Sequence, residues 1–285
     1  MKAIMKVLFT SLLLAMVVPV VAQESSENLK ALVKAEWDFI NLARETNTRD
    51  AFLAQFTEET IVFGEGPVNA KRAYQNQQPN NGWLKWEPIF SDLASSGDFG
   101  YNTGPWEFRV NKTDAKAVAF GHFVSFWHQK TDGSWKLLID IGVDHAQPTQ
   151  TSSWKSSTVE FERISHASEE RNPLETVEQN FIEALAFAKS PAYQAVLSRE
   201  TRFYRPGIQP ITEQASILTY LDEELPITYK KVGHALASSS DLGYVYGTAV
   251  VQLKGNQTKA ANYLHVWKHE KNAGWKLVLD LVTYK

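Results

Sequence analysis

The sequence WHQKTDGSWKLLID at residues 127–140 recurs as WKHEKNAGWKLVLD at residues 267–280, an offset of 140 residues. Upstream, ASSGDFGY at residues 94–101 is matched by ASSSDLGY at residues 237–244, an offset of 143 residues. A deletion of three residues in the second copy, between the two matches, explains the change of offset. Self-similarity at a nearly constant spacing indicates a repeated structural unit. We therefore expect two diverged copies of one domain.

Each copy has the same pattern of expected elements. Apolar residues recur at helical spacing over residues 26–45, and the second copy opens with Asn172 as a helix cap and Pro173 at the first helical position. In the first copy a short strand and a small helix follow, and then four strands separated by turns, at residues 84–94, 98–110, 115–129 and 134–145. Helices that precede an antiparallel meander indicate the α+β class.

The N-terminal residues predict export from the cell. Lys2 and Lys6 precede an apolar run that ends at Val21, and small residues before Gln23 suit a cleavage site. The run is too short to span a bilayer with any margin, although an uncleaved N-terminal anchor is an alternative. We expect a cleaved signal peptide and a periplasmic or secreted protein without a membrane span.

The expected domain organisation follows from the repeat and the signal peptide. A polar, turn-rich stretch separates the two copies and suits a linker. Trp154 and Phe161 lie within it, and they predict that the linker packs against one of the domains. The boundaries are a signal peptide at 1–22, a first domain at 23–145, a linker at 146–172 and a second domain at 173–285.

Composition excludes several classes of function. Removal of residues 1–22 leaves 27 basic and 32 acidic side chains, a formal charge of −5, so no basic field favours nucleic acid. The absence of cysteine excludes disulfides, lipobox acylation, thiolate zinc sites and cysteine nucleophiles. The seven histidines show no ligand spacing for zinc, and no nucleotide-binding or hydrolase motif is present. We expect neither a metal nor a cofactor.

The first copy resembles a known superfamily. Its order of elements, together with SGDFGYNTGPWE at residues 96–107, GHFVSFW at 121–127 and DGSWK at 132–136, is similar to the nuclear transport factor two-like superfamily, closest to its SnoaL-like branches. The resemblance covers the first copy and, more loosely, the second. It implies tandem cone-shaped domains with the ketosteroid-isomerase-like fold, each a bent antiparallel sheet around its N-terminal helices. Members include isomerases, dehydratases, cyclases, binding modules and assembly domains, so the fold does not choose a function.

Three polar residues of the first copy are candidate acids or bases. Glu36 lies among the apolar positions of the first helix, where it could face a cone or form a structural salt bridge, for example with Arg109. Asp140 lies on the last strand, where a base or a structural hydrogen bond is possible. His122 shares a strand face with apolar residues, and such a histidine is more often structural than catalytic. Their equivalents in the second copy are Glu178, Asp280 and Asn262.

Aromatic residues are the remaining clue, because several tryptophans of the first copy have no tryptophan partner in the second. Such residues suit the lining of a pocket that only the first copy needs. The candidate lining residues are Trp37, Phe63, Trp83, Trp86, Trp106 and Trp127.

Three functions are compatible with these observations. The first is an exported protein that binds a small, largely apolar ligand in the cone of the first domain, with the second domain packed on it as a pseudo-dimer partner. The second is an enzyme of the isomerase, dehydratase or cyclase type that uses Glu36, His122 or Asp140 as acid or base. The third is an interaction module in which the sheets of the two copies pack together and no ligand is bound.

Overall fold

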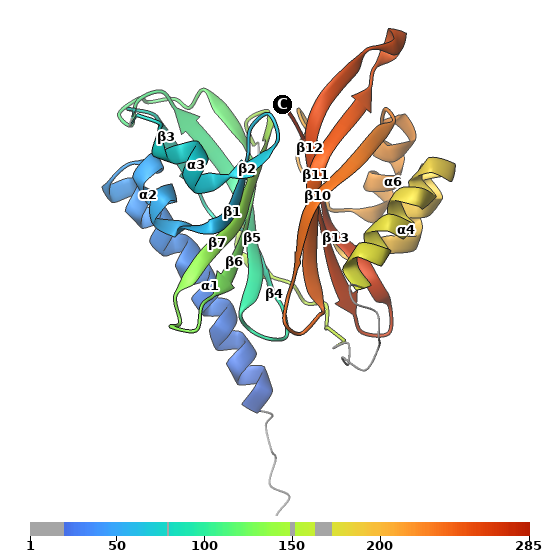
Figure 1. Ribbon diagram of the computed structural model, residues 1–285, viewed down its shortest axis with the longest axis horizontal. Coiled ribbons are helices and arrows are strands. Elements are labelled where there is room, and N and C mark those ends of the chain that lie inside the picture. The colour runs from blue at the N-terminus through green and yellow to red at the C-terminus, as the bar shows by residue number, and fades with distance from the viewer. Residues whose placement is uncertain (1–19, 79, 149–151, 163–172) are drawn as a thin grey trace, which may run out of the picture.

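The computed structural model describes residues 20–78, 80–148, 152–162 and 173–285, with side chains from residue 27 onward (Figure 1). The expected signal peptide lies almost wholly outside these residues and stays a prediction. Within the described ranges, none of the helices combines the length and the apolar character that a membrane crossing requires.

The first half of the molecule, residues 20–145, holds three helices and most of one sheet. The helices are α1 (Val20–Glu45), α2 (Thr48–Gln55) and α3 (Ala70–Gln75). The strands are β1 (Phe56–Phe63), β2 (Pro67–Asn69), β3 (Trp83–Trp86), β4 (Phe90–Leu93), β5 (Phe99–Arg109), β6 (Ala119–Gln129) and β7 (Trp135–His145). Their order is β2-β1-β7-β6-β5-β4-β8, with β3 also paired to β5, and β8 (Lys155–Ser156) lies on the edge.

The second half, residues 173–285, repeats this arrangement with fewer edge strands. Its helices are α4 (Pro173–Phe187), α5 (Lys189–Val196) and α6 (Gln214–Glu223), and a 3₁₀ turn covers Lys254–Asn256. Its strands are β9 (Leu197–Tyr204), β10 (Ile227–Leu236), β11 (Leu242–Gln252), β12 (Thr258–Glu270) and β13 (Gly274–Tyr284), in the order β10-β11-β12-β13-β9. The α+β class with two sheets, each preceded by helices, is confirmed.

The two sheets share a topological detail that the sequence did not indicate. In each, the first strand after the helices pairs in parallel with the last strand, so both sheets are mixed. The hydroxyl of Thr60 donates to the carbonyl of Leu137 at 2.6 Å, and that of Thr201 donates to the carbonyl of Leu277 at the same distance. The repeat therefore extends to individual hydrogen bonds.

One expected strand is divided in two. The sequence pattern predicts a single strand at residues 84–94, whereas the structure has β3 and β4 on either side of Pro88. Proline has no N–H to donate to a ladder, so continuous pairing with β5 is interrupted there. The interruption lies at the mouth of the pocket described below.

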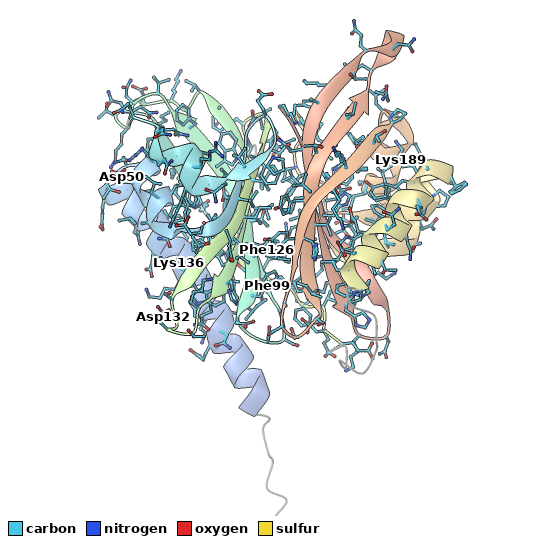
Figure 2. The ribbon with its side chains drawn as sticks, viewed as in Figure 1. Asp50, Phe99, Phe126, Asp132, Lys136 and Lys189 are labelled. Atoms are coloured by element: carbon cyan, nitrogen blue, oxygen red, sulfur yellow. The ribbon has the colours of Figure 1, made fainter. Side chains whose placement is uncertain are left out.

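Each sheet has one face covered by its helices and the other turned toward the second sheet (Figure 1). A single apolar cluster contains buried side chains of both sheets. Phe99 and Phe126 of the first sheet project into it (Figure 2), and the ring of Tyr244 from the second sheet lies 4.6 Å from that of Phe126. Burial of apolar surface on this scale is the main force that holds two sheets together.

Polar contacts accompany the apolar cluster between the sheets. The ammonium of Lys268 lies 2.9 Å from a carboxylate oxygen of Asp92, and both side chains are buried. Ser95 donates to Asp241 across the same boundary. Buried ion pairs of this kind fix the relative position of the parts they join, because each charge requires its partner.

The segment at residues 152–162 crosses from one sheet to the other. The indole of Trp154 donates to the hydroxyl of Ser91 at 3.0 Å, and β8 pairs with β4. Farther along, Phe161 forms a bridge with Glu270 of β12. The expectation that the segment packs against one half was therefore wrong: its residues bind both, because β4 and β12 lie within reach of one extended strand.

Candidate functional site

Glu36 is buried on the helix-covered face of the first sheet. Its carboxylate accepts hydrogen bonds from the indoles of Trp86 and Trp127, both at 2.8 Å, and from Ser125 and Asn102. Burial raises the pKa of Glu36, and these four donors oppose the rise because they favour the ionised form. With all its acceptor positions directed at protein donors, Glu36 holds the first sheet to α1.

Arg109 is not the partner of Glu36. Its guanidinium lies 2.9 Å from Glu107 on the same strand and 5.1 Å from the ring centre of Trp83. The structural role expected for Glu36 is thus filled by neutral donors, because residues from β3, β5 and β6 converge on it. Sequence spacing alone could not identify them.

Glu178 repeats part of this arrangement in the second half. The indole of Trp267 donates to it at 2.8 Å, as Trp127 does to Glu36. His265 takes the place of Ser125 and lies 2.9 Å from Glu178. Burial disfavours the charged imidazole, yet Glu178 and Asp280 together raise the pKa of His265 to about 9.

Asp280 lies in a fully buried ionic network. Arg205 binds both of its carboxylate oxygens, at 2.8 and 3.0 Å, and the hydroxyl of Tyr193 donates to it at 2.6 Å. Burial alone would raise the pKa of Asp280, but Arg205 and His265 hold it below its ordinary value. Glu224 pairs with the same guanidinium. The helix-covered interior of the second half therefore contains buried charged side chains that are paired with charges of opposite sign.

Asp140 occupies the equivalent position in the first half but has no such network. By strand register, Gly64 stands where the second half has Arg205. Within the described part of the chain, Asp140 makes neither a hydrogen bond nor an ion pair, although it lies across from Ser125 on the neighbouring strand. Burial, with a smaller effect of Glu36, raises the pKa of Asp140 to about 8.

His122 lies on the opposite face of the sheet from Glu36 and Asp140, between the two sheets. Its Nδ1 lies 2.7 Å from Nε2 of His145, and its ring lies 5.5 Å from that of Tyr204. Burial, aided by His145 and Arg202, lowers the pKa of His122 to about 3, so it is neutral at pH 7. The three acid or base candidates do not converge on one point. Asn262, the equivalent residue, donates to the carbonyl of Gly64.

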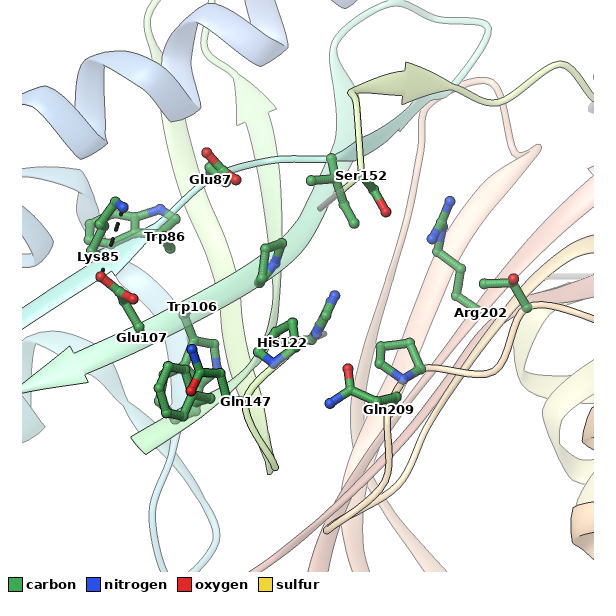
Figure 3. A pocket seen from close by; sticks show the side chains of 16 residues that line it. Lys85, Trp86, Glu87, Trp106, Glu107, His122, Gln147, Ser152, Arg202 and Gln209 are labelled. Atoms are coloured by element: carbon green, nitrogen blue, oxygen red, sulfur yellow. Dashed lines mark ion pairs between the residues drawn. The ribbon is translucent and has the colours of Figure 1, made fainter. Parts of the chain in front are cut away.

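A pocket of about 480 Å³ opens where the edge of the first sheet meets the second half (Figure 3). Trp106, Phe120 and His122 line it from β5 and β6, and Arg202 lines it from β9. The loop that follows β9 completes the wall with Gln209 and Pro210. Both halves therefore contribute to one site.

The indole of Trp106 is accommodated by two glycines. A Cβ at Gly121 would lie 2.4 Å from the Trp106 ring, and a Cβ at Gly142 would lie 3.3 Å from its Nε1. The first of these distances is shorter than any ordinary contact, so only glycine leaves room for the indole there. The ring is thereby held on the helix-covered face of the sheet, where it packs against the apolar cluster of the first half, opposite to His122.

The other aromatic candidates are distributed over different parts of the structure. Trp86 lines the pocket and also binds Glu36, whereas Trp127 is wholly buried. Trp37 is 39% exposed on α1, and Trp83 borders a separate surface hollow beside α2. Phe63 packs against Tyr246 between the sheets. Of the six aromatic candidates, Trp86 and Trp106 line the pocket.

Sequence reasoning missed the cations of the second half. Arg202, Arg205 and Lys268 are all buried, and nothing in their local sequence distinguishes them from exposed basic residues. Among the described residues, no group of three or more acidic or imidazole side chains is placed to hold a metal ion.

Comparison with known proteins gives similarity of fold. Neither a protein-family model nor a curated protein matches this sequence. A ketosteroid isomerase-like protein from Erwinia carotovora atroseptica is 15% identical, over 39% of this chain and 92% of its own, with a TM-score of 0.34. An NTF2-like protein from Cytophaga hutchinsonii is 16% identical, over 41% of this chain and 100% of its own, with a TM-score of 0.34.

A third solved structure is an NTF2-like protein of unknown function in nutrient uptake from Rhodospirillum rubrum. It is 18% identical, over 40% of this chain and 99% of its own, with a TM-score of 0.33. At such identities the similarity concerns the fold alone and carries no information about substrate or activity.

Proposed function

We propose that this protein is exported and binds a small molecule with a large apolar portion in the pocket between its two halves. The observation that carries the proposal is the pocket of about 480 Å³ whose wall includes Pro105, the ring of Phe120 and Pro210. Ligand sites are typically concavities of about 300–1,000 Å³ with apolar walls and a few polar groups. The site differs from the cone pocket of the first domain that the sequence predicts, because it lies between the two halves rather than beneath the helices.

Binding is favoured over an interaction module without a ligand. The sheets of the two halves pack together in one apolar cluster, as the module and the binding protein both require, so this packing does not choose between them. A filled seam would support the module, whereas the pocket leaves space for a ligand.

One observation favours an enzymatic alternative. Asp140 has a pKa of about 8 and no partner among the residues described, so it can hold or release a proton near neutral pH. It faces the helix-covered side of the sheet, whereas the pocket residue His122 faces the other side. An acid–base reaction at Asp140 would require the substrate to enter beneath α1.

Native mass spectrometry of the purified protein tests the proposal. We expect a stoichiometric adduct of small mass that is lost in Phe120→Ala, because the variant removes an apolar wall of the pocket. Trp37→Ala is the matched control, since Trp37 is exposed on α1 and outside the pocket. A clean apo mass that persists after incubation with cell extract would contradict the proposal. An activity lost in Asp140→Asn but retained in Phe120→Ala would favour the enzyme.

A further inference from the structure

We infer that the ligand of this pocket is an anion, a carboxylate carried on an apolar body, and that the guanidinium of Arg202 anchors it. The inference rests on the proposed function and adds the chemical class of the ligand. Arg202 comes from the second half, whereas Trp106 comes from the first (Figure 3). The site is therefore incomplete in either half alone.

Arg202 is a buried cation without a counterion. Its side chain is 7% exposed, and within the part of the chain that the structure describes it forms no hydrogen bond and no ion pair. Its guanidinium carbon lies 3.8 Å from the centre of the ring of Phe90. Buried charges in proteins are normally paired, because an unpaired charge loses its hydration without compensation.

The neighbouring buried cations follow that rule. Arg205, three residues farther along, binds Asp280 and Glu224, and Lys268 binds Asp92. Arg202 thus departs from the pattern of its own surroundings. A ligand that supplies the missing negative charge accounts for the difference.

Carboxylates near the pocket do not supply that charge. Glu107 pairs with Arg109 at 2.9 Å, and Glu87 is exposed to solvent. Glu200, on the same strand as Arg202, accepts hydrogen bonds from Ser157 and Thr158 instead. These positions leave the guanidinium directed at the pocket.

The histidine in the pocket does not compete for an anion. Nδ1 of His145 lies 2.7 Å from the carbonyl of Ala146 and so carries a proton, which leaves its Nε2 to accept from His122. His122 is neutral at pH 7, since burial lowers its pKa to about 3. The other cation of the described wall, Lys85, is exposed and lies 3.8 Å from Glu107, so Arg202 is the buried cation that an anionic ligand would meet there.

The shape of the site fits a planar acid. A guanidinium binds a carboxylate through two parallel N–H···O bonds, which fixes the orientation of the acid. The rings of Pro105, Phe120 and Pro210 offer apolar surface to the rest of the ligand. A bicyclic aromatic acid has the right combination of charge and apolar area.

Isothermal titration calorimetry on the full chain tests the inference with two probes that share one ring system, 2-naphthoate and its uncharged amide 2-naphthamide. We expect the wild-type protein to bind the acid about tenfold to a hundredfold more tightly, as a charged hydrogen-bonded contact requires. Arg202→Met should abolish this preference, and Arg202→Lys should retain part of it. Arg199→Met is the matched control, because Arg199 is an exposed arginine on the same strand and should leave the preference unchanged.

Thermal unfolding of the same variants separates a binding role from a structural one. We expect Arg202→Met to unfold at the same temperature as the wild type or higher, because removal of an unpaired buried charge is neutral or stabilising. A large drop in its unfolding temperature would mean that Arg202 serves the fold, and would overturn the inference.

The binding outcomes distinguish the two proposals. Equal affinity for both probes, or an acid preference that survives in Arg202→Met, would overturn the role of Arg202 while the pocket remains a binding site. Failure of both probes to bind the wild type at about 1 mM would overturn the proposed function and the inference together, since a ligand of this size gains about that affinity from an apolar site.

Discussion

Asp140 and Asp280 occupy the same register position on the last strand of their sheets, yet only Asp280 is ion-paired. Arg205 and His265 surround Asp280, whereas Gly64 and Ser125 stand in their places around Asp140. Two copies of one fold have therefore diverged in their interiors. The interior of the second half contains charged side chains that are ion-paired. The interior of the first half retains a carboxyl without a partner among the described residues.

The unpaired carboxyl predicts how stability depends on pH. The folded-state pKa of Asp140 is about 8, against 3.8 when unfolded, so folding binds a proton to this group and its contribution to stability falls as pH rises from 4 to 8. His122 contributes with the opposite sign, because its folded-state pKa is about 3 against 6.5 when unfolded. Asp140→Asn should raise the free energy of unfolding at pH 9 by about 1–3 kcal/mol, and should remove the falling contribution between pH 4 and 8. Urea unfolding at a series of pH values measures this.

A matched control for that experiment is Asp144→Asn, an exposed aspartate on the same strand. It should leave both stability and slope unchanged. Stability that still falls with rising pH in Asp140→Asn at pH 4–6 would show that another acid titrates there, because the contribution of His122 rises in this range. The slope that remains above pH 6.5 is expected from His265, whose pKa of about 9 makes its contribution complete below pH 6.5 and lost as pH rises through 9.

The ionic network of the second half predicts a large cost when one partner is removed. Arg205→Met leaves Asp280 and Glu224 buried without their counterion, so we expect a loss of about 3–5 kcal/mol in the free energy of unfolding. The double variant Arg205→Met/Asp280→Asn should recover part of that loss. Chemical denaturation of both variants makes the comparison. A loss under about 1 kcal/mol, the size of a surface pair, would contradict the network seen here.

The four donors to Glu36 predict that its carboxylate stabilises the first half. Glu36→Ala leaves two indoles, an amide and a hydroxyl without their acceptor, and should cost about 3–5 kcal/mol. Because Trp86 and Trp127 are fluorophores, their fluorescence emission during unfolding can measure this loss of stability. Glu45→Ala, on the exposed part of the same helix, should cost less than about 0.5 kcal/mol. Equal effects of the two substitutions would refute a special role for Glu36.

The ion pair between the sheets predicts energetic coupling between the halves. In a double-mutant cycle of Lys268→Met and Asp92→Asn, each single variant should destabilise by about 3–5 kcal/mol and the double variant by less than their sum. The exposed pair Lys271–Glu160 serves as the comparison and should couple by at most about 1 kcal/mol. Strict additivity at Lys268 and Asp92 would mean that the two charges do not act together.

Much of the fold could be read from local sequence. The repeat, the order of helices and strands and the equivalence of Glu36 with Glu178 follow from short-range patterns, because hydrophobic periodicity and turn residues act between neighbours in the chain. Alternation along β6 also placed His122 on one face with Val124 and Phe126, and that grouping is confirmed. The sequence did not show which part of the chain covers that face.

The site was decided by the tertiary structure. Arg199 and Arg202 lie three residues apart on β9 and are chemically identical, yet one is exposed and the other is buried beside the pocket. Their difference arises only when the sheet that contains Phe90, more than a hundred residues earlier, packs against that strand. The sequence by itself determined two α+β units and their polar candidates. The tertiary structure decided which charged side chains are buried and which of these have a partner of opposite charge. Both depend on contacts between segments that are distant in the sequence.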